Sequence, residues 1–87
     1  MLTMKMLENC FQGAKEQNAK YVGIAVTIPN AKEREVIINA AANFDEKLKY
    51  YQQAYDKYLH HKHAKGIQIV GFTYGNNFQE IQDDLGV

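Results

Sequence analysis

Residues 21–28 read Tyr-Val-Gly-Ile-Ala-Val-Thr-Ile, and this stretch decides the fold. The aliphatic side chains alternate with smaller or more polar ones, which is the period of a β-strand with one buried face. Pro29-Asn30 ends the run with turn residues, and a charged stretch over residues 32–35 follows. A second apolar run, Val36-Ile37-Ile38, then predicts the returning strand. The sequence therefore predicts a β-hairpin with a wide polar loop.

Helical patterns lie on both sides of this hairpin. Residues 4–14 carry apolar side chains at helical spacing, which predicts an amphipathic helix before the first strand. After the second strand, Asn43 followed by Glu46 has the pattern of an N-cap with its capping-box partner. The stripe expected to be buried from there on consists of Phe44, Leu48, Tyr51, Tyr55, Tyr58 and Leu59. It predicts a long helix that begins at Asn43 and continues through Leu59.

A third strand and a last helix complete the chain. Residues 67–74 are apolar on both predicted faces, and the alternation puts Ile67 and Ile69 on one face. The other face is expected to carry Val70, Phe72 and Tyr74. A second capping pattern, Asn77 with Glu80, then predicts a short helix to the C-terminus.

The order α-β-β-α-β-α predicts an α+β fold over residues 1–87 as a single domain. A helical crossover places the third strand parallel to the second, and the simplest arrangement sets it beside the first. We therefore expect a three-stranded antiparallel sheet of order 2-1-3 covered by helices, which resembles a ferredoxin-like fold lacking its first strand. Such a sheet has two open edges, where another chain can add.

Composition narrows the function classes. Lys+Arg and Asp+Glu both number 10, so no overall field attracts nucleic acid or an acidic membrane. Arg34 is the single arginine, which argues against sequence-specific DNA binding. The chain contains no serine, and Cys10 lies on the apolar stripe of the first helix, where it serves as a small hydrophobe. We expect no catalytic residues and no cofactor, because the sequence shows no catalytic constellation. We expect a cytoplasmic protein, because no signal peptide or membrane span is evident.

The histidine cluster at residues 60–63 is the one pattern that suggests a metal. If the predicted helix continues, His60 and His63 lie three residues apart on one face, as metal ligands can. No acidic or cysteine ligand lies nearby in the sequence. The alternative interpretation is that the histidines and neighbouring lysines complement the negative end of a helix dipole.

Two weaker patterns suggest binding surfaces. Tyr74, Gly75, Asn76 and Asn77 form a strand, a glycine turn and a helix N-terminus in succession, a backbone geometry that can hold an anion such as a nucleotide phosphate. Neither the dinucleotide fingerprint nor the P-loop spacing is present, so a tight turn with a helix cap is the simpler interpretation. Interface candidates are Tyr50, which lies off the buried stripe, and Val70 and Phe72 on the third strand.

Six segments of the chain resemble a family of short hypothetical proteins found in phages and prophages of Gram-positive bacteria: residues 20–23, 35–39, 43–45, 48–51, 54–55 and 69–75. No activity is assigned to that family, so the resemblance implies only a context. Small accessory phage proteins often block a host factor or sequester a signalling nucleotide. We therefore expect a non-enzymatic binding protein, forming a homo-oligomer, that acts as a phage accessory or anti-defence factor by occupying a host protein. The alternative is a protein that sequesters a nucleotide or cyclic nucleotide.

Overall fold

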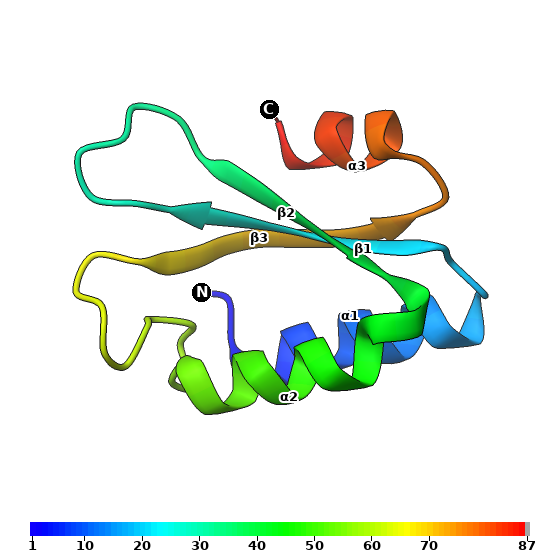
Figure 1. Ribbon diagram of the computed structural model, residues 1–87, viewed down its shortest axis with the longest axis horizontal. Helices are drawn as coiled ribbons and strands as arrows, with labels where there is room; N and C mark the ends of the chain where they lie inside the picture. Colours follow the sequence, from blue (N-terminus) through cyan, green and yellow to red (C-terminus); the bar gives the residue numbers. More distant parts are fainter. Residues whose placement is uncertain (87) are drawn as a thin grey trace.

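Two helices cover one face of a three-stranded antiparallel sheet, and a third helix lies on the other face (Figure 1). The computed structural model describes residues 1–86. The elements are α1 (Met4–Glu16), β1 (Tyr21–Thr27), β2 (Glu35–Ala40), the 3₁₀ turn η1 (Ala41–Asn43), α2 (Phe44–Ala54), β3 (Gln68–Gly75) and α3 (Phe78–Leu85). The strand order β2-β1-β3 and the α-β-β-α-β-α arrangement confirm the predicted fold. No helix among these residues is long and apolar enough to span a membrane.

The main core lies between the sheet and the α1–α2 pair. The alternating aliphatic residues of β1, Val22, Ile24 and Val26, point toward these helices and are buried. Phe11 of α1 meets Phe44 at the start of α2 edge to face, with ring centroids 5.6 Å apart. Because apolar burial is the dominant favourable term in folding, this layer supplies most of the packing that holds the domain together.

Helix α3 packs on the opposite face of β1 and β3 at very short range. Ile81 and Leu85 of α3 are buried against Ala25 of β1. A Cβ atom on Gly23 would lie 2.1 Å from the Cγ2 atom of Ile81, closer than any real contact allows. Glycine at position 23 therefore sets how closely α3 approaches the sheet.

A β-bulge in β3 overturns the predicted faces of that strand. The register with β1 shifts between Ala25 and Val26, which pair with Gly71 and Ile69, so β3 carries one extra residue at Val70. Val70 packs on the α3 side, whereas Phe72 packs against the main core. The prediction that Val70 and Phe72 share a face is wrong, because a bulge interrupts the two-residue alternation on which it relied.

Helix α2 ends at Ala54, five residues before the predicted end at Leu59. Tyr55 already has extended backbone angles, φ −118° and ψ 149°. The Oδ1 atom of Asp56 then accepts hydrogen bonds from the backbone N–H groups of Tyr58 and His60, at 2.9 and 3.0 Å. This side-chain turn competes with the helix for the same N–H groups, and Leu59 follows it at φ 66°. Consequently Tyr58 is exposed instead of lying on a buried helical stripe.

Candidate functional site

The outer edge of β2 has free backbone groups. The N–H of Ala41 donates to the carbonyl oxygen of Lys20 at 2.9 Å, so the alternation of an antiparallel ladder turns the N–H and C=O groups of Val36, Ile38 and Ala40 away from β1. Among residues 1–86, the carbonyl oxygen of Ala40, the N-cap of η1, accepts the first hydrogen bond of that 3₁₀ turn, and the other outward backbone groups of β2 are unpaired. We call these outward groups the open edge of β2.

The outer edge of β3, by contrast, is partly covered by the chain itself. The N–H of Ile69 donates to the carbonyl oxygen of Leu59 at 2.9 Å, and His60 forms an isolated β-bridge with Gln68. The segment that follows the Asp56 turn therefore lies along the first half of β3. The expectation of two open edges holds for β2 but needs correction for β3, because this half of the β3 edge is already paired.

A mostly apolar surface surrounds α3 on its side of the sheet. Val36 and Ile38 of β2 and Val70 of β3 are half-buried beside α3. At the start of α3, Phe78 is 54% exposed, and its ring lies edge-on to that of Tyr21 with centroids 4.9 Å apart. We call these five residues the α3-side patch. It combines a held but exposed aromatic pair with aliphatic neighbours, the composition that is typical of protein interfaces.

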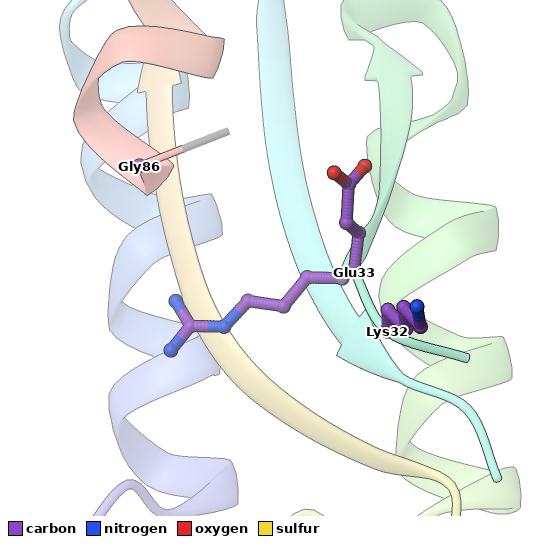
Figure 2. A pocket seen from close by; sticks show the side chains of 4 residues that line it. Lys32, Glu33 and Gly86 are labelled. Atoms are coloured by element: carbon purple, nitrogen blue, oxygen red, sulfur yellow. The ribbon is translucent and has the colours of Figure 1, made fainter. Parts of the chain in front are cut away.

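A shallow depression of about 400 Å³ lies between the β1–β2 loop and the end of α3. Its lining residues are Lys32, Glu33, Arg34 and Gly86, and Figure 2 shows Lys32 and Glu33 on the loop with Gly86 at the end of the helix. All four are exposed and the charges are of mixed sign. The depression therefore lacks the enclosed, mainly apolar walls of a small-molecule site.

The predicted anion site at residues 74–77 is occupied by groups of the chain itself. Asn77 Oδ1 accepts the N–H of Glu80 at 2.9 Å, as the capping pattern predicts, and Glu80 Oε2 accepts the N–H of Asn76 at 3.2 Å. Asn76 Oδ1 in turn accepts the N–H of Lys20 at 3.1 Å. The Glu80 carboxylate thus already uses a turn N–H and would repel a phosphate.

Tyr74 does not join Gly75 and the two asparagines in one pocket. Its ring lies over Gly13 of α1, 3.2 Å from where a Cβ atom on that glycine would stand. This contact is on the α1–α2 side of the sheet, whereas Asn77 caps α3 on the other side. Gly13 within α1 is thereby explained by the close approach of an aromatic side chain.

The histidine cluster adopts loop geometry. His60 and His63 do not share a helical face, because α2 has ended before them. His61 Nδ1 accepts the backbone N–H groups of His63 and Ala64, both at 3.0 Å, and therefore acts as a turn-forming acceptor. Within residues 1–86 no group of three or more His, Cys, Asp or Glu side chains is placed to hold a metal ion.

The three interface residues predicted from the sequence fall on different parts of the molecule. Tyr50 is 51% exposed on α2, on the side of the sheet away from Val70. Phe72 packs against the main core. Sequence reasoning missed Phe78 as an exposed anchor. Its edge-to-face partner Tyr21 was nevertheless expected on the face of its strand opposite the aliphatic one.

Cys10 is a poor nucleophile in this fold. Burial raises the pKa of the Cys10 thiol to about 11, so almost none of it is thiolate at neutral pH.

The chain matches no protein-family model, no curated protein and no solved structure. The site must therefore be interpreted from its own geometry.

Proposed function

We propose that this chain is a non-catalytic protein-binding domain and that the α3-side patch is its contact surface. The partner is a host protein, in keeping with the sequence resemblance to short phage proteins. Binding occupies and thereby blocks that protein. Large exposed aromatic side chains backed by aliphatic ones supply contact area with little loss of conformational freedom, which is why they dominate interface energies.

One observation carries this proposal: the exposure of Phe78. The residue is 54% exposed, and its ring packs edge to face on that of Tyr21 with centroids 4.9 Å apart, so its position is fixed before any partner arrives. Phe78 is the first residue of α3, and the buried anchors of that helix are Ile81 and Leu85. The proposed role of its ring is to fill a pocket on a partner.

The nucleotide-sequestering alternative has no comparable support. The turn that was expected to hold a phosphate carries the Glu80 carboxylate, hydrogen-bonded to the N–H of Asn76. An anion at this turn would have to displace a negative group that the fold already uses. The geometry of this turn therefore favours protein binding over nucleotide sequestration.

The test compares capture of host proteins by the tagged wild-type chain with capture by Phe78→Ser. Tyr50→Ser is the matched control, because Tyr50 is equally exposed but lies on the other side of the sheet. Truncating a central aromatic anchor costs at least about 2 kcal/mol, a loss of roughly 30-fold in affinity for the captured protein. We expect Phe78→Ser to lose its partner and Tyr50→Ser to retain it. Equal capture by both variants, or no specific partner with the wild type, would overturn the proposal.

A further inference from the structure

We propose that a second copy of this chain pairs with the open edge of β2. The two β2 strands lie antiparallel about a two-fold axis, and the two sheets join into one of six strands. This inference goes beyond the proposed host-binding function, because it is carried by backbone groups at the edge of the sheet and not by Phe78. The β2 strand of a second copy fits this edge because its outward backbone groups are complementary to those of the first.

The edge is open, and Glu35 at the first position of β2 is its one charged residue. β2 reads Glu-Val-Ile-Ile-Asn-Ala, with three consecutive β-branched residues and without proline, lysine or a bulge. Soluble monomeric proteins block such edges with charges, prolines, bulges or covering segments. In this chain a covering segment exists for the first half of β3, where Leu59 and His60 pair with the strand. The fold covers the first half of the β3 edge and leaves the length of the β2 edge available.

The pattern of outward groups is self-complementary. A two-fold axis beside Ile38 places Ile38 opposite Ile38 of the second copy, and Val36 opposite Ala40 of the second copy. The N–H and C=O groups of Val36 and Ile38 face outward, as does the N–H of Ala40. The central pair can exchange two hydrogen bonds, and each Val36–Ala40 pair can form one, from the N–H of Ala40 to the carbonyl oxygen of Val36, about four in all. On the α3 side, the two Ile38 side chains then meet at the axis.

Charge does not oppose this arrangement. The formal net charge of the chain is +0, so two copies experience no overall repulsion. In the same register Glu35 of each copy lies at the end where β2 of the other copy passes into η1. The two Glu35 side chains are separated by six residues of strand, roughly 20 Å at the rise of a β-strand. Antiparallel pairing thus sets the charged end of β2 against the alanine-rich end.

Ala40 offers a substitution that removes edge pairing without disturbing the monomer. Its backbone angles are φ −77° and ψ 152°, which proline adopts without strain, and its N–H points away from β1. Ala40→Pro therefore deletes an outward donor from each copy and sets a ring against the neighbouring strand. Ala40→Ser is the matched control, because it changes the same exposed side chain and keeps the N–H.

The experiment measures mass by sedimentation equilibrium from low micromolar to several hundred micromolar protein. We expect the wild type and Ala40→Ser to reach about twice 10.0 kDa, and Ala40→Pro to remain at 10.0 kDa with an unchanged circular dichroism spectrum. A wild type that stays monomeric over this range would overturn the inference. So would an Ala40→Pro variant that dimerises as strongly as the wild type, because the dimer would then use another surface.

Cross-linking tests the register. In a Cys10→Ala background, Ile38→Cys is expected to give a covalent dimer with a short bismaleimide, whereas Gln53→Cys on the exposed face of α2 is not. A mixture of Val36→Cys and Ala40→Cys chains should cross-link more efficiently than either chain alone. Cross-linking at Gln53 but not at Ile38 would contradict the arrangement.

The two proposals fail separately. Phe78→Ser should leave the sedimentation mass of a dimer intact, and Ala40→Pro tests pairing in the absence of any host protein. A dimer that captures no host protein overturns the proposed function alone. A monomer that captures a host protein through Phe78 overturns the pairing of β2 alone.

Discussion

Replacing Tyr51 with phenylalanine is expected to lower the free energy of unfolding at neutral pH. Tyr51 is 2% exposed, and its hydroxyl donates to Asn39 Oδ1 at 3.2 Å. Asn39 is also buried and donates from Nδ2 to the carbonyl oxygen of Val22 at 3.1 Å. This chain of hydrogen bonds ties α2 to β2 and β1 across the main core. Apart from the tyrosines, Asn39 is the only buried residue with a polar side chain among residues 1–86.

The magnitude follows from what the substitution removes. The aromatic ring of residue 51 remains, so its contacts with Phe11 and Tyr55, at centroid distances of 6.3 and 6.0 Å, are preserved. The lost hydroxyl leaves Asn39 Oδ1 buried without a donor. Leaving one buried polar group unpaired costs about 1–3 kcal/mol. We expect a loss of stability within that range.

Urea denaturation measures this loss, with Tyr50→Phe as the control. Tyr50 is half-exposed and its hydroxyl can reach water, so Tyr50→Phe should change the unfolding free energy by less than about 0.5 kcal/mol. A double-mutant cycle with Asn39→Leu should show coupling between residues 39 and 51. If Tyr51→Phe is no less stable than Tyr50→Phe, the hydrogen bond does not stabilise the fold and the reasoning is refuted.

Tyr51→Phe should also change how the free energy of unfolding depends on pH. Desolvation by burial raises the pKa of Tyr51 to about 12, despite the opposing effect of its hydrogen bond to Asn39. An unfolded tyrosine has a pKa near 10, so ionisation of the unfolded chain begins first as the pH rises. The folded wild type therefore loses stability between about pH 10 and pH 12, and Tyr51→Phe lacks this part of the loss. The difference in stability between the two proteins should narrow above pH 10; a constant difference would contradict the cause assigned to the shift.

Three further predictions concern the packing of α3, the turn after α2 and the thiol. Gly23→Ala should lower the unfolding free energy by about 1–3 kcal/mol in urea denaturation, because the added methyl meets Ile81; unchanged stability would contradict the close packing. Backbone hydrogen bonds, chiefly from His60, lower the pKa of Asp56, so melting temperatures of the wild type should fall more steeply below about pH 4 than those of Asp56→Ala; parallel profiles would contradict the turn. Because its pKa is raised to about 11, Cys10 should react with a disulfide reagent much more slowly in the folded chain than in the urea-unfolded chain, and equal rates would contradict the raised pKa.

The hairpin and the order of elements could be predicted because they depend on local patterns. The alternation of residues 21–28 fixes which side chains of β1 enter the core, and the observed burial of Val22, Ile24 and Val26 follows it. The cap of α3 is equally local, since Asn77 binds the N–H of Glu80 only three residues away. At Asn43 the helix begins as predicted, but the side chain makes no capping hydrogen bond because η1 precedes it.

The end of α2 and the faces of β3 depend on competition that no pattern records. Residues 55–59 have helical apolar spacing, yet the Asp56 carboxylate binds two N–H groups that a helix would need. In β3, the sequence pattern does not reveal the one-residue bulge. Both faces of the strand are apolar, so its residues fit the pattern whether or not the alternation is shifted by one. Of the candidate surface, the sequence indicated an open sheet edge but could not say which edge the chain would cover.

These two departures from the prediction are physically connected, and the connection bears on which edge is free. Because the Asp56 turn stops α2 early, the chain is extended by the time it reaches β3, and the carbonyl oxygen of Leu59 can accept the N–H of Ile69. A helix continued to residue 59 would point that carbonyl along its own axis, beyond its C-terminal end, and not toward β3. The Asp56 turn therefore releases Leu59 and His60 from the helix and lets them pair with the first half of β3. No comparable segment adjoins β2 among residues 1–86, where η1 leads directly from the strand into α2. The same local chemistry that protects one edge thus concentrates the unpaired backbone of the sheet at β2, the strand through which we propose that two copies meet.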